Sequence, residues 1–216
     1  MSDQREKILV QACALFLKDG LDGFSMRKLA KAVGVTAPAL YRHFESKERL
    51  LHDVLGEAYR RMSARLYQAL EGATPWERLQ LAGRGYVLFA LEHPRLYDAL
   101  FASPELVGIA DIPEEIEAQG CAVGRFWNDR IRECMDAGML HPGDPEGVGI
   151  TMWAHAHGLI SLHSRGLLMP GVEADTSDFL RVYRESMERM LRGLRGTAQE
   201  PVVATGDDGK VAGAAA

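Results

Sequence analysis

Apolar residues recur at intervals of three and four positions along almost the whole chain, and no segment shows a convincing run of strict alternation between apolar and polar residues. The first spacing puts apolar side chains on one face of an α-helix, whereas alternation would indicate a half-buried strand. The 216 residues are 47% hydrophobic and 25% charged, which suffices for a core without disulfides or metals. The sequence therefore predicts an all-α fold without a sheet.

Helix start and stop signals divide the chain into nine predicted helices. Ser25, Thr36, Ser46 and Thr74 each stand where a side-chain hydroxyl can cap the following helix. The polar segment 71–73 is the expected domain boundary. It separates an N-terminal domain (3–62) from a C-terminal domain (74–195), and the segment 196–216 lacks apolar periodicity and is expected to be disordered. The predicted helices cover about 4–19, 26–33, 37–43, 47–71, 75–92, 95–101, 114–137, 145–165 and 177–195.

Charge is distributed unevenly along the chain, although the formal net charge is −5. The first 61 residues hold eleven basic and eight acidic side chains and so carry +3, while the rest of the chain carries −8. A basic segment attached to an acidic body suggests that the basic segment binds a polyanion.

Residues 25–44 combine two short predicted helices with a tight turn between them. Gly34 supplies the left-handed backbone that such a turn needs, and Ala30 is small enough for the two helices to approach closely. This is the pattern of a helix-turn-helix, whose second helix lies in the major groove of DNA. An ordinary pair of packed helices has the same spacing, so the pattern alone leaves both interpretations open.

The flanking residues favour DNA binding. Lys47 begins the next predicted helix, where a cation opposes the helix dipole but suits a phosphate contact. Thr36 can offer both its hydroxyl and free backbone N–H groups to a phosphate. The predicted operator surface consists of Arg27, Lys28, Thr36, Pro38, Tyr41, His43 and Lys47.

Residues 3–62 resemble the DNA-binding domain of the tetracycline-repressor (TetR) family of bacterial transcription regulators. The matching stretches include 8–16, 24–30, 33–35 and above all 39–51, which contains Leu40-Tyr41-Arg42-His43-Phe44 followed by Lys47. The resemblance implies an all-helical homodimer whose C-terminal domain senses a small molecule and releases operator DNA. The stretch 153–158 is also similar to a Trp-x-x-x-His-Gly signature found in one branch of these regulators.

The C-terminal half concentrates aromatic and methionine residues at about 76–101, 121–135 and 150–163. Helical bundles bind ligands between facing helices, in largely apolar cavities with a few polar groups. We expect an apolar or aromatic, weakly charged effector, although Arg84 or Arg130 could pair with an acidic one. Simple core packing would explain the same residues. The predicted pocket residues are Tyr86, Phe89, Trp127, Met152, Trp153, His155 and His157.

The three histidines at 155, 157 and 163 are not predicted to bind a metal ion. Helical residues two apart point about 200° away from each other, so His155 and His157 cannot hold one ion from the same face. His155 and His163 are two turns apart, which is too far for a shared ion. We therefore expect no metal and no cofactor.

The last predicted helix has an apolar stripe that is too wide for an exposed surface helix. The preceding helix contains glycines and alanines that permit close helix approach. We expect these two helices to form a four-helix dimer interface. Its predicted residues on the last helix are Phe179, Val182, Tyr183, Met187 and Met190.

Several function classes are not expected. No run approaches the roughly 18 uncharged apolar residues of a membrane span, no secretion signal is visible, and the three cysteines suit a reducing cytoplasm. Motifs typical of hydrolases, phosphate loops and zinc proteases are missing, so an enzyme is not expected. The main hypothesis is a dimeric, ligand-responsive repressor that binds double-stranded operator DNA. Two alternatives remain: a DNA-binding regulator with a protein or redox input, and a helical binding module without DNA binding.

Overall fold

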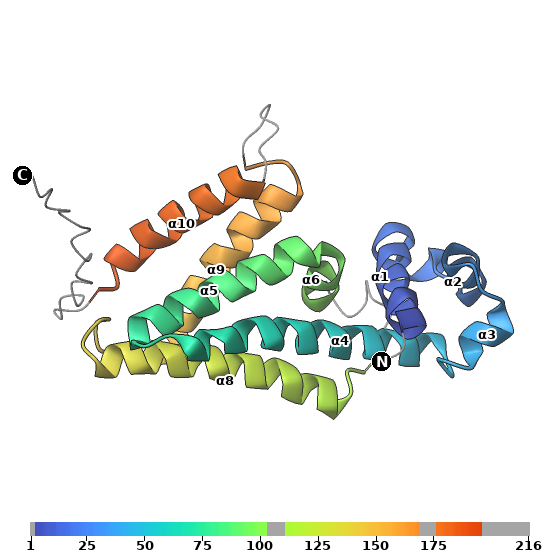
Figure 1. Cartoon of the computed structure of the whole chain (residues 1–216), viewed down its shortest axis with the longest axis horizontal. Helices are drawn as coiled ribbons and strands as arrows, with labels where there is room; N and C mark the ends of the chain where they lie inside the picture. Colours follow the sequence, from blue (N-terminus) through green and yellow to red (C-terminus); the bar gives the residue numbers. More distant parts are fainter. Residues whose placement is uncertain (1–2, 103–110, 169–175, 196–216) are drawn as a thin grey trace, which may run out of the picture.

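The computed structural model describes residues 3–102, 111–168 and 176–195, and the predicted disordered tail lies outside these ranges. Within them the chain forms nine α-helices, one 3-10 helix and a single isolated bridge between Leu140 and Arg195. The predicted all-α fold is confirmed. The elements in Figure 1 are α1 (Asp3–Gly23), α2 (Met26–Val33), α3 (Ala37–Tyr41), α4 (Lys47–Tyr67), η1 (Gln68–Glu71), α5 (Pro75–Glu92), α6 (Pro94–Phe101), α8 (Glu114–Asp136), α9 (Pro145–Ser164) and α10 (Thr176–Arg192).

The long helix α4 joins the two ends of the molecule. Helices α1, α2 and α3 gather around its N-terminal end, while α5, α8, α9 and α10 form a bundle around the remainder (Figure 1). Helix α6 packs against both α1 and α4. The buried side of α4 is apolar along nearly its whole length and consists of Leu50, Leu51, Val54, Leu55, Ala58, Met62 and Leu66, with Glu57 as the charged exception.

Local caps determine where four of the helices begin. The hydroxyl oxygens of Ser25, Thr36, Ser46 and Thr74 each accept a hydrogen bond from the backbone N–H three residues later, at 3.2, 3.3, 3.0 and 3.1 Å respectively. Each bond satisfies a backbone donor that lacks a partner inside the helix. The four helix starts predicted from these residues are confirmed.

Several predicted helix ends are wrong. Helix α4 ends at Tyr67 and α10 at Arg192, before the predicted ends at 71 and 195. Helix α1 continues past Gly20 to Gly23, because a glycine inside a helix costs only about 1 kcal/mol relative to alanine and does not by itself end the helix. Helix α3 ends at Tyr41 rather than at residue 43. There the N–H of His43 donates to the carbonyl of Leu40 at 2.9 Å, and this three-residue spacing tightens the last turn.

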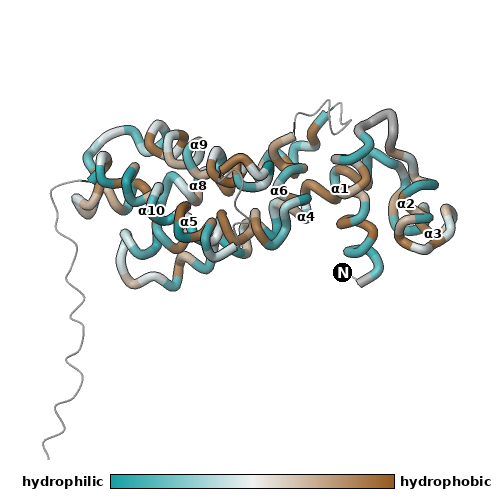
Figure 2. Tube along the Cα trace, turned by 90° about the horizontal axis from the view of Figure 1, so that it is seen from above, coloured by the Kyte–Doolittle hydropathy of each residue, from teal (hydrophilic) through white to brown (hydrophobic). Residues whose placement is uncertain are grey.

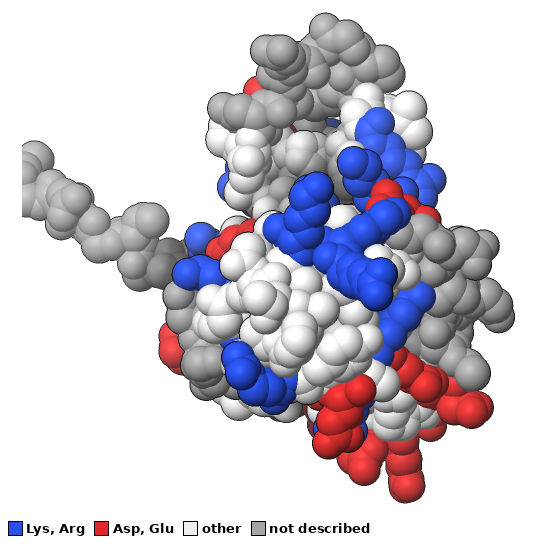
Figure 3. All heavy atoms as spheres, turned by 90° about the vertical axis from the view of Figure 1, so that its right-hand side faces the viewer, with Lys and Arg blue, Asp and Glu red and all other residues white. Residues whose placement is uncertain are grey.

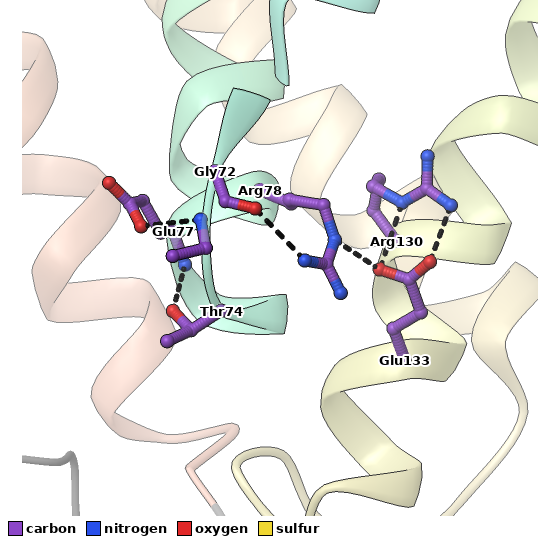
Figure 4. Close-up of polar contacts among 7 residues, drawn as sticks. Gly72, Thr74, Glu77, Arg78, Arg130 and Glu133 are labelled. Atoms are coloured by element: carbon purple, nitrogen blue, oxygen red, sulfur yellow. Dashed lines mark hydrogen bonds and ion pairs between the residues drawn. The ribbon is translucent and has the colours of Figure 1, made fainter. Parts of the chain in front are cut away.

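A cluster of charged side chains fastens the start of α5 to α8 (Figure 4). Arg78 donates from Nε to Glu133 at 2.9 Å and from a terminal nitrogen to the carbonyl of Gly72 at 3.0 Å, and Arg130 donates two further bonds to Glu133. Burial alone would raise the pKa of Glu133, but the bonds from Arg130 and Arg78 outweigh it and lower that pKa. The cluster therefore stabilises the fold at neutral pH, and this contribution is lost as the pH falls through the lowered pKa.

Each long helix has an apolar and a hydrophilic side, which Figure 2 shows as alternating brown and teal along the tubes. The apolar stripe of α10 faces its own protomer, where Phe179, Tyr183, Met187 and Leu191 are buried. None of the described helices is long and apolar enough to cross a membrane.

Helices α4 and α5 touch at Gly85, where a Cβ atom would lie 2.6 Å from the carbonyl oxygen of Arg65. We therefore expect Gly85→Ala to lower the free energy of unfolding by about 1–3 kcal/mol, because two backbones would have to separate. Gly124 has no heavy atom within 4 Å of the corresponding position. Gly124→Ala should instead raise the free energy of unfolding by about 0.5–1 kcal/mol. Urea unfolding at one fixed protein concentration measures both, and equal effects of the two substitutions would contradict the close contact.

Candidate functional site

The corner between α2 and α3 has the geometry of a helix-turn-helix. Gly34 adopts a left-handed backbone with φ 77°, and the N–H of the next residue, Val35, donates to the carbonyl of Ala30 at 2.9 Å. Ala30 and Leu40 are buried between the two helices. The corner therefore fixes the angle at which α3 projects from the molecule.

Helix α3 presents mostly uncharged side chains to solvent. Thr36, Pro38, Tyr41 and His43 are all exposed, and half of Tyr41 is accessible. The hydroxyl oxygen of Thr36 accepts the capping bond from Ala39, so its proton remains able to donate to an external acceptor. These side chains offer hydrogen-bonding and apolar contacts of the kind that read base edges.

Cationic side chains flank α3. Arg27 and Lys28 are exposed on α2, and Nζ of Lys28 lies 3.3 Å from a carboxylate oxygen of Asp19. Lys47 is half-buried at the start of α4, with Nζ 5.2 Å from the centre of the Phe24 ring. Figure 3 looks at this end of the molecule and shows Lys and Arg side chains around an uncharged area, with acidic groups collected toward one edge.

All seven predicted DNA-binding residues thus come from the α2, α3 and α4 N-terminal region at one end of the molecule (Figure 1). An uncharged helix surrounded by cations suits DNA, because phosphates flank a groove in which base edges are exposed. Contact with DNA by these individual residues stays a prediction.

A cavity of about 320 Å³ lies within the C-terminal bundle. Its walls come from α4, α8 and α9, with single side chains added by α5, α6 and α10. Tyr86, Trp127 and Trp153 line it, as the predicted pocket requires. Most of the lining is apolar or aromatic, and the volume falls within the range of small-molecule sites in proteins.

A chain of hydrogen bonds leads from this first cavity toward α6. Nε1–H of Trp153 donates to the hydroxyl of Tyr86 at 3.0 Å, the hydroxyls of Tyr86 and Tyr97 are 2.9 Å apart, and the hydroxyl of Tyr97 lies 2.6 Å from Nδ1 of His157. Burial lowers the pKa of His157 and so favours the neutral ring, whose Nδ1 can accept a hydrogen bond from the hydroxyl of Tyr97. The hydroxyl of Tyr86 then accepts from Trp153 and donates to Tyr97, and the hydroxyl of Tyr97 accepts from Tyr86 and donates to His157.

The same groups stay uncharged at neutral pH. Burial raises the pKa of Tyr86 to about 12, and burial also raises the pKa of Tyr97. The ring of Phe101 lies 4.8 Å from that of His157 and 5.8 Å from that of Trp153, measured between centroids. This end of the cavity therefore offers flat apolar surfaces and neutral hydrogen-bonding groups.

The other predicted pocket residues lie elsewhere. Met152 lines a second cavity, Phe89 is completely buried in the core, and Nε2 of His155 is 3.0 Å from the hydroxyl of Ser186 on α10. His155 and His157 are two positions apart, which is about 200° around the helix, so the two rings face different neighbours. Of the seven predicted residues, Tyr86, Trp127 and Trp153 line the first cavity. Phe89, Met152, His155 and His157 do not, although His157 is connected to the cavity through the hydrogen-bond chain.

Sequence reasoning missed the contribution of α4 and α10. Tyr59, Met62 and Leu66 form part of the cavity wall, and Tyr183 closes it from α10. The spacing of apolar residues places a side chain on the inner face of a helix, but it does not say whether that side chain meets another one or an open space. Tyr183 was predicted at the dimer interface, and its burial inside the protomer is a correction.

The second cavity has a volume of about 510 Å³ and lies between α5 and α10. Leu79, Val87 and Met187 contribute apolar surface, while the exposed charged side chains among its lining residues are Arg84, Arg184, Glu77 and Glu188. This cavity therefore combines an apolar floor with a charged rim.

Three of the five residues predicted at the dimer interface are buried within the protomer. Phe179, Tyr183 and Met187 face the interior of their own protomer, which accounts for the apolar stripe of α10 without a partner. Val182 and Met190 are only half-buried. The interface on α10 therefore stays a prediction for Val182 and Met190 alone.

Helix α9 has the most apolar exposed surface of the bundle. Residues 147–164 contain no Asp, Glu, Lys or Arg, yet 58% of Ile150 and 42% of Leu162 are exposed. Ala154 is exposed between them, and nothing lies within 4 Å of the Cβ position at Gly158. An uncharged helix face with small and branched side chains is typical of a surface that packs against another helix.

Ion pairs connect α1 to α4. Arg61 bonds to Glu57 at 2.6 Å and also pairs with Glu6 of α1, while Arg5 of α1 pairs with Asp53 at 2.9 Å. Burial alone would raise the pKa of Glu57, but hydrogen bonds from Arg60 and Arg61 lower it, so the carboxylate stays charged. The N-terminal helices are thus fastened to the helix that lines the first cavity.

The described residues give little support to metal binding or to thiol chemistry. They contain no group of three or more His, Cys, Asp and Glu side chains that could hold a metal ion. Burial raises the pKa of Cys13 and of Cys134 to about 12, so neither is a thiolate at neutral pH. Cys121 is exposed.

Comparison with known proteins relates both halves of the chain to one family. Residues 8–54 match the family described as bacterial regulatory proteins, tetR family, and residues 79–194 match the tetracyclin repressor-like C-terminal domain. The transcriptional repressor KstR2 of Mycolicibacterium smegmatis is 28% identical over 145 residues, which cover 65% of this chain and 69% of that protein.

Solved structures share the fold over nearly the whole chain. A Rhodococcus protein of unknown function is 26% identical with a TM-score of 0.71, over 90% of this chain and 96% of that one. The regulator AibR, solved with isovaleryl coenzyme A and operator DNA, is 20% identical with a TM-score of 0.64, over 89% and 98% of the two chains. Together with the helix-turn-helix and the cavity-containing bundle, these matches show that the chain belongs to the TetR family of bacterial transcriptional regulators and is a DNA-binding regulator with a C-terminal effector-binding domain.

Proposed function

We propose that this protein is a homodimeric repressor, rather than an enzyme, that leaves its operator when a small apolar effector occupies the first cavity. The observation that carries the proposal is the double role of α4. Its N-terminal half packs against α1, and its C-terminal half supplies Tyr59, Met62 and Leu66 to the cavity wall. A ligand that prefers one position of α4 therefore also selects one position of the DNA-binding helices.

In this proposal residues 3–62 act as the DNA-binding domain. Helix α3 enters the major groove, where Pro38, Tyr41 and His43 face base edges, and Thr36 contacts a phosphate with its free proton. Arg27, Lys28 and Lys47 contact phosphates on either side of the groove. All of these side chains lie at one end of the molecule, and all except the half-buried Lys47 are exposed, which supports this assignment.

Residues 74–195 act as the effector-binding and dimerisation domain. The uncharged exposed face of α9, together with Val182 and Met190 of α10, supports a four-helix interface between two copies. Two recognition helices must then reach successive major grooves, roughly 34–36 Å apart. A tilt of α4 in each protomer changes that separation without altering the helix-turn-helix itself.

The effector proposed for the first cavity is apolar or aromatic and weakly charged. Its walls present aromatic rings, and its hydrogen-bonding groups include the neutral side chains Tyr86, Trp153 and Asn128. This chain shares its fold with AibR, whose structure contains both a small molecule and operator DNA. That likeness supports the proposal that this chain binds both classes of partner.

A gel-shift experiment with DNA from upstream of the protein's own gene tests the proposal. We expect the protein to retard a specific fragment in the presence of competitor DNA, and an apolar compound that quenches tryptophan fluorescence to release that fragment. Retardation without release by any fluorescence-quenching compound would favour a protein or redox input. Failure to retard any specific fragment would instead favour a helical binding module.

Lys47→Ala should weaken binding to all DNA sequences about equally. Removing one phosphate contact lowers the slope of log K against log salt by about one unit and reduces affinity several-fold. Tyr41→Ala should instead change the order in which operator variants are preferred, because Tyr41 faces base edges. Fluorescence anisotropy at several salt concentrations distinguishes the two results. Unchanged affinity and salt dependence for Lys47→Ala would show that α3 docks differently.

A further inference from the structure

Two side chains line both cavities of the C-terminal bundle. The first cavity lies among α4, α8 and α9 and the second between α5 and α10, and Trp127 and Tyr183 are the residues that appear in both linings. The cavities are therefore neighbours that share a wall of two aromatic side chains. Their volumes are about 320 and 510 Å³.

The Trp127 indole lies between two glycines. Its Cη2 atom is 3.7 Å from the position of a Cβ at Gly83 on α5, and its Cδ1 atom is 3.5 Å from the corresponding position at Gly149 on α9. A Cβ atom at either position would only make ordinary van der Waals contact with the ring. Glycines thus flank both edges of the indole.

Polar contacts do little to hold this wall in place. Nε1 of Trp127 is buried and has no hydrogen-bond partner among the described residues. The hydroxyl of Tyr183 donates to the carbonyl of Gly83 at 3.4 Å, which is long for a hydrogen bond between oxygens. Moving the indole therefore breaks no polar contact described here, whereas a buried N–H without a partner gains when a ligand acceptor reaches it.

From these contacts we infer that Trp127 is a movable partition between two compartments of one effector chamber, which takes an elongated amphipathic molecule. The inference rests on the proposed function of the first cavity. The apolar body of the molecule occupies the aromatic compartment beside Trp153. Its polar end lies at the rim of the second compartment, whose charged lining residues are Arg84, Arg184, Glu77 and Glu188. A short ligand fits the first compartment alone, whereas a long one displaces the Trp127 ring.

Two glycine substitutions fill one compartment each. Gly124 lines the first cavity and Gly83 lines the second, and the nearest atom to either Cβ position is no closer than 3.7 Å. Gly124→Leu therefore fills the first compartment and Gly83→Leu the second, and both replace a helical glycine by a better helix former. Circular dichroism and the operator affinity without ligand show whether each variant is folded.

Hexanoate and dodecanoate serve as short and long probes in calorimetric titrations without DNA. Each additional buried CH₂ raises affinity roughly fourfold, so the wild type should bind dodecanoate much more tightly than hexanoate. Gly124→Leu should weaken both probes at least about tenfold. Gly83→Leu should weaken dodecanoate by a similar factor and leave hexanoate unchanged. Unchanged dodecanoate affinity in Gly83→Leu, absence of dodecanoate binding to the wild type, or two independent molecules bound per chain would each overturn the inference.

The partition itself is tested by Trp127→Phe, with Trp76→Phe as the matched control, since Trp76 lines neither cavity. A smaller ring makes the wall easier to open. Trp127→Phe should therefore weaken hexanoate several-fold but bind dodecanoate at least as tightly as the wild type, and Trp76→Phe should change neither. Equal weakening of both probes by Trp127→Phe would show a fixed wall.

The titrations test the divided chamber and the gel shift tests the regulatory role, so either hypothesis can fail without the other. If the probes bind as expected but no compound releases the operator, the divided chamber stands and the proposed regulatory role is wrong. If a compound releases the operator while Gly83→Leu leaves dodecanoate binding unchanged, the regulatory role stands and the divided chamber is wrong.

Discussion

Replacing Ala154 by Glu is expected to convert the proposed dimer into a monomer and to lower operator affinity by at least about 100-fold. Ala154 is exposed in the middle of the uncharged face of α9. In the proposed interface the new carboxylate would meet its symmetry-related copy in apolar surroundings, where unpaired charges are very costly. A monomer binds one half-site at a time and loses the gain in affinity that comes from linking two half-sites.

Sedimentation velocity at micromolar concentration, combined with anisotropy on operator DNA, measures this effect. Ala118→Glu is the matched control, because Ala118 is also an exposed alanine but lies on α8, away from the proposed interface. The control should remain dimeric and bind the operator normally. A dimeric Ala154→Glu variant with full operator affinity would place the interface on another surface.

The second large effect is expected for Trp153→Ala. The indole forms part of the first cavity wall and donates the hydrogen bond that orients the hydroxyl of Tyr86. Its removal takes away a flat apolar contact and the start of the hydrogen-bond chain to His157. We expect the concentration of a releasing compound needed for half-maximal release to rise at least about tenfold, because burying an aromatic side chain against a ligand contributes several times RT.

Operator affinity without effector should fall far less in Trp153→Ala than in Ala154→Glu, because Trp153→Ala places no charge on the exposed face of α9. Gel shifts over a range of effector concentrations, with Trp76→Phe as the control, measure the two quantities separately. Full induction at the wild-type effector concentration would show that the effector binds somewhere other than beside Trp153.

Local features made the N-terminal end predictable. A capping hydroxyl contacts an N–H only three residues away, and Gly34 adopts its left-handed backbone for reasons contained in the turn itself. The starts of α2, α3, α4 and α5 and the corner between α2 and α3 could therefore be predicted from short stretches of sequence. The exposure of Thr36, Pro38, Tyr41 and His43 followed as well, because Leu40 is the one large aliphatic side chain of this short helix.

The pocket could be predicted only in part, because its parts are distant in the sequence. Tyr97 and His157 are 60 positions apart, and Trp153 and Tyr86 are 67 apart, yet both pairs are hydrogen-bonded. Aromatic composition indicated some of the helices that contribute to a pocket, but not α4 or α10. It could not distinguish Trp153, which lines the cavity and is 43% exposed, from Phe89, which fills the core, since both are aromatic residues of predicted helices.

The sequence by itself determined the all-α class, the helix starts and the DNA-binding corner, because these depend on contacts within a few residues. The tertiary structure alone decided which apolar faces meet. It directs the stripe of α10 into its own protomer, leaves the face of α9 exposed, and places Trp127 between Gly83 of α5 and Gly149 of α9. Those outcomes depend on how whole helices pack against one another, and periodicity identifies an apolar face without identifying the surface that covers it.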